Sequence, residues 1–213
     1  MARILTRREA LVGVSSTLLL PLGCSQSSAP DTASDAIYLH GVASGDPDST
    51  SVVIWTRVSN SSGMTGVAWR VATDADFQNV IARGKASTDE GRDHTVKVVV
   101  NGLSAGQEYF YQFDVDGIMS PTGRTRTLPT GHVDRLVIAV ATCSNYAFGY
   151  FNAYEAIAND SAIDLVVHLG DYIYEHGRES YAGETGRRIG RNHEPSHEAL
   201  TLVDYRQRFA QYK

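Results

Sequence analysis

Short apolar runs and clusters of Gly, Asn, Asp and Ser alternate along residues 37–128. The runs are rich in β-branched and aromatic residues, a composition typical of strands. In the last run, Tyr109, Tyr111 and Phe113 fall on one face and polar residues fall on the other, as in a strand with one side in a core. This spacing predicts a β sandwich. The runs are SVVIWTRV (51–58), TGVAWRVATD (65–74), HTVKVVV (94–100) and EYFYQFDVDG (108–117).

A turn followed by a tyrosine-bearing strand makes this interpretation more specific. NGLSAGQEYFY (101–111) resembles the tyrosine corner of fibronectin type III and immunoglobulin-like domains, where a leucine and a turn precede the key tyrosine. We therefore expect residues 37–129 to form a seven-stranded sandwich domain of this kind. Pro and Gly in PTGH (129–132) would end the sandwich and serve as a linker.

Beyond this linker the hydrophobic period changes. RLVIAVATCS (135–144) and AIDLVVHLGD (162–171) are unbroken apolar runs, typical of strands in a sheet covered on both faces. GYFNAYEAIANDS (149–161) between them has the spacing of an amphipathic helix. Strand, helix and strand over ~35 residues predict a βαβ unit with parallel strands. Residues 130–213 would thus begin an α/β domain.

The last part of the chain predicts a loop and a helix. Residues 176–196 are rich in Gly, Arg, Glu and His, and they are expected to form a loop too long for a simple connection. Thr201 stands three residues before Asp204, the spacing of a capping box. Leu202, Tyr205, Phe209 and Tyr212 would then form the apolar face of a helix over residues 201–213.

The amino terminus has the organisation of an export signal. Arginines precede an apolar stretch over residues 11–22, which is about half the ~20 residues that a membrane span needs. Thr6-Arg7-Arg8 resembles a twin-arginine (Tat) signal. We expect residues 1–24 to direct export to the periplasm or cell envelope of a bacterium.

Leu22-Gly23-Cys24 resembles a bacterial lipobox. Cys24 would then carry the lipid of a lipoprotein, and the Ser/Ala-rich residues 25–36 would form its tether. The alternative is ordinary signal-peptide cleavage a few residues further on. A lipid anchor is the only membrane contact that we expect.

Composition restricts the partners and the cysteine chemistry. The chain is 42% hydrophobic and 20% charged, and its net charge of -5 without a basic block after the amino terminus argues against a nucleic-acid surface. Only Cys24 and Cys143 are present. If Cys24 is lipidated or removed, Cys143 has no disulfide partner. Cys143 would then be a buried small residue, a nucleophile or a metal ligand.

Both expected α/β strands end in ligand-type residues. Cys143 follows the first strand, and Asp171 and Tyr174 follow the second. In α/β sheets, ligands bind outside the carboxyl ends of the strands. A thiolate, a carboxylate and a phenolate suit trivalent iron better than magnesium. The spacing therefore predicts a metal site that these three residues share.

The same residues carry a family resemblance. Gly170-Asp171-x-x-Tyr174 resembles the block of purple acid phosphatases in which the Asp bridges two metals and the Tyr binds ferric iron. The chain as a whole resembles the amino-terminal portion of PhoD-like alkaline phosphatases and phosphodiesterases, members of the metallophosphatase superfamily. The matching blocks are GVASGDPDSTSVVIWTRV (41–58), ATCSN (141–145), AYEAIAND (153–160), LVVHLGDYIYE (165–175) and TLVDYRQRFAQYK (201–213).

The resemblance implies a metallophosphatase domain and a mechanism. Cys143 and Tyr174 would bind Fe³⁺, and Asp171, the catalytic residue, would bridge it to Ca²⁺. Phosphate monoesters or diesters would be hydrolysed by metal-activated water. Apart from the resemblance, Asn145 follows Cys143 closely enough to stand next to the ligands, and a turn-forming role is the alternative. His176 and Arg191 lie in the long loop and would face substrate phosphate, with a solvated loop as the alternative.

Blocks that complete the metal sphere in this family are absent from these 213 residues, including a D-D-H-E-like block. We therefore expect an incomplete chain with part of a metal site and little or no hydrolytic activity on its own. The alternative function is an envelope-anchored β-sandwich binding module without catalysis. Bound iron and its tyrosinate absorption band would distinguish the two.

Overall fold

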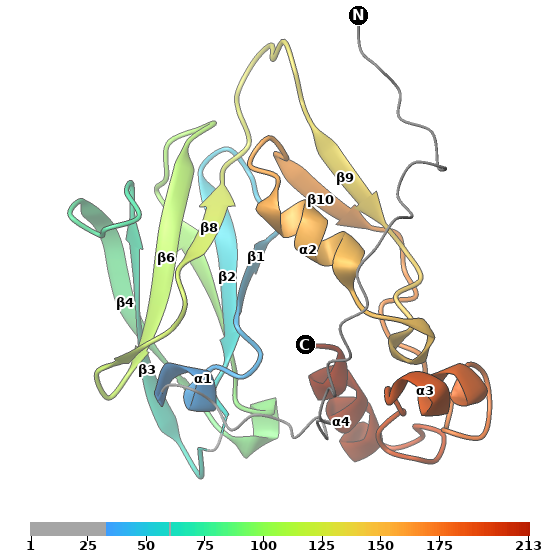
Figure 1. Cartoon of the computed structure of the whole chain (residues 1–213). Coiled ribbons are helices and arrows are strands. Elements are labelled where there is room, and N and C mark those ends of the chain that lie inside the picture. Colours follow the sequence, from blue (N-terminus) through green and yellow to red (C-terminus); the bar gives the residue numbers. More distant parts are fainter. Residues whose placement is uncertain (1–32, 60) are drawn as a thin grey trace, which may run out of the picture.

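The computed structural model describes residues 33–59 and 61–213 (Figure 1). The expected export signal, the lipidation site Cys24 and residues 25–32 lie outside the described residues. A β sandwich comes first, and a smaller α/β part packs beside it (Figure 1). In the described ranges, no helix is long and apolar enough to cross a membrane.

The sandwich contains a three-stranded sheet in the order β1-β2-β5 and a five-stranded sheet in the order β4-β3-β6-β7, in which β8 also pairs with β6. All of these pairs are antiparallel. The expected sandwich is confirmed, but it has more strands than the seven predicted. The strands are β1 (Val42–Gly45), β2 (Ser51–Arg57), β3 (Thr65–Ala72), β4 (Val80–Thr88), β5 (Thr95–Asn101), β6 (Glu108–Val115), β7 (Ile118–Met119) and β8 (Gly123–Arg126).

The alternation read from the sequence produces the core. In β6 every second residue is buried, and Phe113 and Ile54 are fully enclosed between the sheets. Tyr111 and Phe113 meet edge to face, with ring centroids 6.2 Å apart. Tyr109 forms the expected tyrosine corner, since its hydroxyl accepts a 2.8 Å hydrogen bond from the backbone N–H of Ser104.

The strand β4 was not predicted, because its residues alternate small and charged side chains and contain no longer apolar run. It lies at the edge of its sheet, where β3 supplies the pairing. A short helix, α1 (Ala33–Ile37), precedes β1 and includes the last residues of the expected tether. Ser34 donates to the Met119 carbonyl, and Tyr38 after the helix donates to the Ile118 carbonyl, so this segment packs against β7.

Close contact between strands makes Gly123 of β8 a sensitive position. A Cβ atom at Gly123 would lie 2.2 Å from Cζ of the buried Tyr111. We expect Gly123→Ala to destabilise the sandwich by about 1–3 kcal/mol, because an overpacked core must shift its side chains. Urea unfolding of the chain measures this loss. Gly66→Ala in β3 is the matched control, since no atom lies within 4 Å of its Cβ position; equal stability of the two variants would contradict the prediction.

The α/β part confirms the βαβ unit. β9 and β10 pair in parallel, with Ile138 opposite Leu165, and α2 lies on the side of this pair that faces the sandwich (Figure 1). The elements are β9 (Ile138–Ala141), the 3-10 helix η2 (Tyr146–Phe148), α2 (Asn152–Asn159), β10 (Leu165–His168), α3 (Gly183–Ile189) and α4 (Leu202–Tyr212).

The expectation that both strands are buried was wrong. Val140 is 61% exposed and Val166 is 50% exposed, because β9 and β10 form a sheet of only two strands in the described part of the chain. Such a sheet has no neighbouring strands to carry a covering layer across both faces. His168, at the end of β10, hydrogen-bonds through Nε2 to the Tyr154 hydroxyl of α2 at 2.8 Å.

The expected loop over residues 176–196 contains the helix α3, which was not predicted because two glycines, Gly183 and Gly186, interrupt any apolar stripe there. The capping box of α4 is confirmed: Thr201 Oγ1 accepts from the Asp204 backbone N–H, and Asp204 Oδ2 accepts from the Thr201 N–H. Its expected apolar face is partly wrong. Leu202 is exposed, and Arg208 and Tyr212 are the buried residues of the helix.

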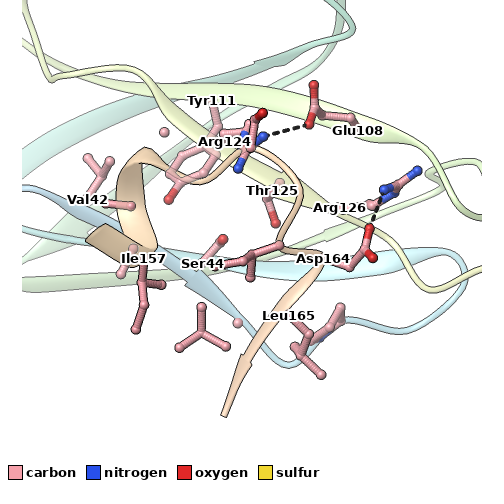
Figure 2. Close-up of a pocket in the computed structure, with 18 of the residues that line it drawn as sticks. Val42, Ser44, Glu108, Tyr111, Arg124, Thr125, Arg126, Ile157, Asp164 and Leu165 are labelled. Carbon is pink, nitrogen blue, oxygen red and sulfur yellow. Dashed lines mark hydrogen bonds and ion pairs between the residues drawn. The ribbon is translucent and has the colours of Figure 1, made fainter. Parts of the chain in front are cut away.

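Two sets of polar contacts join the sandwich to the α/β part. Arg126 of β8 forms a 2.7 Å ion pair with Asp164, just before β10 (Figure 2). Arg206 of α4 donates to the backbone carbonyls of Glu90 and Gly91, in the 3-10 helix η1 (Glu90–Arg92) of the sandwich. Between the sandwich and α2 lies a crevice of about 640 Å³ (Figure 2).

Candidate metal centre

The ends of β9 and β10 bring the predicted ligands together. The Cys143 N–H donates to the Gly170 carbonyl at 3.2 Å, and the Ser144 N–H donates to the Asp171 carbonyl at 3.0 Å. These bonds continue the parallel pairing past the regular strands. Cys143 and Asp171 both adopt left-handed backbone conformations, with φ of 58° and 52°. Non-glycine residues take this conformation uncommonly, and such strain is typical of functional sites.

One carboxylate oxygen connects the three side chains. Cys143 Sγ lies 3.5 Å from Asp171 Oδ2, and the Tyr174 hydroxyl donates to the same oxygen at 3.2 Å. The side chains of Cys143 and Asp171 are exposed to solvent. The geometry therefore places a thiol, a carboxylate and a phenol around one point that solutes can reach.

This cluster is electrostatically unfavourable for ionised groups without a cation. Desolvation and the adjacent Cys143 and Asp171 raise the pKa of Tyr174 well above its ordinary value. Two like charges at such distances disfavour each other's ionisation, whereas a cation between them favours it. The three side chains thus form a donor set that a trivalent ion would fit by its charge and ligand preference.

Cys143, Asp171 and Tyr174 form the cluster as a thiol, a carboxylate and a phenol. Among the described residues, no group of three or more His, Cys, Asp and Glu side chains could hold a metal ion. A tyrosine is not counted in such groups, so the predicted site would depend on the phenol of Tyr174. The large crevice next to α2 contains none of the three predicted ligands, so it is separate from this cluster (Figure 2).

Asn145 and His176 lie close to this cluster along the chain. Asn145 is buried, and its Oδ1 accepts from the Ala147 N–H at 3.0 Å as the cap of η2, while its Nδ2 has no hydrogen-bond partner among the described residues. The His176 ring stacks on that of Tyr174, with centroids 6.3 Å apart. His176 therefore supports the phenol of the predicted ligand.

The side chain of Arg191 packs against aromatic rings, so the alternative of a solvated loop does not describe this residue. Its guanidinium lies 3.7 Å from the centroid of the Tyr146 ring, and it also contacts the rings of Tyr150 and Phe151. Its Nε donates to the Tyr146 carbonyl at 2.8 Å. These contacts fix the long loop onto η2 and the start of α2.

Two further residues near the cluster were not singled out as site residues. His193 of the long loop is 1% exposed, and neither ring nitrogen has a hydrogen-bond partner among the described residues. Burial, followed by the charge of Arg208 and the nearby His176, lowers the pKa of His193 to about 4. Arg208 gave a weak signal, because it is one of two arginines between the apolar positions Tyr205 and Phe209 of an amphipathic helix.

Comparisons with known proteins define the family. The family model for the amino-terminal domain of PhoD-like phosphatases matches residues 23–129, and the model for PhoD-like phosphatase matches residues 138–213. The chain belongs to the PhoD-like phosphatase family. It is 39% identical over 207 residues to alkaline phosphatase D of Bacillus subtilis (strain 168), an alignment that covers 92% of this chain and 35% of the relative.

A solved structure supports the same assignment. The structure of PhoD superposes with a TM-score of 0.77 at 40% identity, over 86% of this chain and 36% of that chain. The chain thus spans about a third of the length of these relatives. The family resemblance seen in the sequence is confirmed.

Proposed function

We propose that this chain provides the amino-terminal part of a phosphoric ester hydrolase, in which Cys143, Asp171 and Tyr174 bind ferric iron. The observation that carries this proposal is the shared oxygen, Asp171 Oδ2, which lies within 3.5 Å of Cys143 Sγ and 3.2 Å of the Tyr174 hydroxyl. Family membership and 39% identity to an alkaline phosphatase support phosphate-ester hydrolysis as the reaction of the complete enzyme.

The donor chemistry fits the proposed ions. Thiolate and phenolate favour Fe³⁺, and the second carboxylate oxygen of Asp171 is a hard ligand that suits Ca²⁺. When bound, such a metal pair supplies an activated water and neutralises charge on the phosphoryl oxygens.

Within this proposal, the chain's own residues hold the donors in place. The backbone bonds from Cys143 and Ser144 to the Gly170-Asp171 segment fix the distance between the thiol and the carboxylate. Solvent exposure of both groups leaves room for a phosphate ester to approach. We further propose export, on the strength of the signal-like pattern in residues 1–24, with Cys24 as the anchor.

A visible absorption band tests this assignment. The purified chain loaded with ferric iron is expected to be coloured by charge transfer from Tyr174 to the iron. Tyr174→Phe is expected to abolish the band, because phenylalanine has no phenolate to donate. Tyr172→Phe is the control, since the Tyr172 ring packs against His168 and Phe209 outside the cluster. A colourless wild-type chain that still folds would favour a binding module over a hydrolase.

A further inference from the structure

A fully buried arginine lies beneath the loop that carries Tyr174. Arg208 of α4 is 0% exposed. Its guanidinium donates to backbone carbonyls of two separate segments. The acceptors are the carbonyls of Tyr174, His176 (2.9 Å), Glu194 (2.8 Å) and Pro195 (3.0 Å).

The burial of this charge requires a reason. Removing a charged group from water is costly unless hydrogen bonds and dipoles compensate for it. Desolvation lowers the pKa of Arg208, and its hydrogen bonds go to carbonyl groups and not to a carboxylate. An apolar side chain could fill the same space without this cost. What only the guanidinium provides is a planar set of donors that binds several carbonyls at once.

The acceptors of Arg208 flank the phenol of the candidate metal centre. Arg208 Nη1 binds both the Tyr174 and the His176 carbonyl, and the rings of these two residues stack on each other. The other acceptors, Glu194 and Pro195, belong to the far end of the long loop. Arg208 therefore ties the start of the long loop, next to Tyr174, to its end.

We propose that Arg208 is a positioning residue of the metal centre, which holds the Tyr174 backbone so that its hydroxyl stays on Asp171. This proposal rests on the proposed function, because it assumes that Tyr174 is a ligand. A ligand that is held in this way need not be reordered when the ion binds. Mutation of a group that orients a metal ligand typically lowers metal affinity 10–100-fold.

The same helix provides a matched control. Arg206, two residues earlier, also donates to two backbone carbonyls, but these belong to Glu90 and Gly91 of the sandwich. If the contribution of Arg208 were merely to dock α4, loss of either arginine would have a similar effect. If Arg208 positions Tyr174, only its own loss changes the iron site.

The first readout is spectroscopic and uses the purified chain loaded with ferric iron. Arg208→Met is expected to weaken iron binding by about 10–100-fold in competition with a chelator and to shift or weaken the tyrosinate band. Arg208→Lys keeps the charge but loses the planar fork, so an intermediate loss is expected. Arg206→Gln is expected to match the wild type. Folded Arg208 variants with wild-type affinity and band would overturn the proposal.

The second readout needs no iron. Amide hydrogen exchange over residues 172–178 is expected to accelerate in metal-free Arg208→Met and to remain unchanged in Arg206→Gln. If Arg208→Met does not fold, Arg208→Lys decides by the same two measurements. A wild-type chain without the tyrosinate band would refute the proposed function, whereas unchanged exchange in folded Arg208 variants would refute the clamp itself.

Discussion

Replacing Asp171 by asparagine is expected to lower the affinity of the chain for ferric iron by more than about 100-fold, because loss of a ligand should exceed the effect of losing a group that orients one. Asparagine keeps the size of the side chain and removes its negative charge. Cys143 and Tyr174 both contact Asp171 Oδ2, so the Asp171 carboxylate lies at the centre of this cluster.

Iron affinity by chelator competition measures this effect in the chain itself. Hydrolysis is measured in a chimera in which this chain replaces the matching third of alkaline phosphatase D of Bacillus subtilis. There, Asp171→Asn is expected to reduce cleavage of bis-p-nitrophenyl phosphate to background. Asp160→Asn, at an exposed turn where Oδ1 accepts from the Ala162 N–H, is the control. An Asp171→Asn variant with undiminished iron affinity would remove Asp171 from the site.

Acid is expected to destabilise the chain through His193. The pKa of His193 is lowered to about 4 in the folded chain, mainly by burial, whereas an unfolded histidine titrates near 6.5. Between these values the unfolded chain binds a proton that the folded chain does not, so stability falls as pH falls. The two pKa values differ by about 2.5, and each pKa unit is equivalent to 1.36 kcal/mol, so the free energy of unfolding is expected to fall by about 3 kcal/mol.

This loss begins as pH falls through about 6.5 and is complete near pH 4, while above 6.5 His193 is neutral in both states. His193→Leu removes the titrating ring and leaves no hydrogen-bond partner behind among the described residues. Urea unfolding between pH 7 and pH 4 is expected to show a smaller loss of stability in this variant than in the wild type. His132→Leu, at an exposed position, controls for removal of an imidazole. Parallel pH profiles for wild type and His193→Leu would contradict the prediction.

The sequence allowed the sandwich and the meeting of three site residues to be predicted, for different reasons. Apolar and polar residues alternate around Phe113, and this local spacing is enough to predict a strand with one buried face. Cys143, Asp171 and Tyr174 could be brought together because the carboxyl ends of parallel strands are neighbours. That argument needs only the order of the elements and not their packing.

Packing decided the features that the sequence did not reveal. The helix α3 forms although Gly183 and Gly186 disfavour a helix, and both of these glycines are buried in tight contacts. The burial of Arg208 depends on carbonyls from two distant segments, which no local pattern encodes. Val140 was expected to be buried, but it is exposed. An apolar residue in a strand shows only that its burial would be favourable. It does not show whether another part of the chain covers it.

The two arginines of α4 also have a thermodynamic consequence. Arg206 attaches the helix to the sandwich, and Arg208 attaches it to the loop of the candidate metal centre. An isolated helix of 11 residues is marginal in water, so α4 depends on its tertiary contacts for its stability. By linkage, an ion that stabilises the loop around Tyr174 would stabilise the helix through Arg208, by the same free energy with which a formed helix favours the ion.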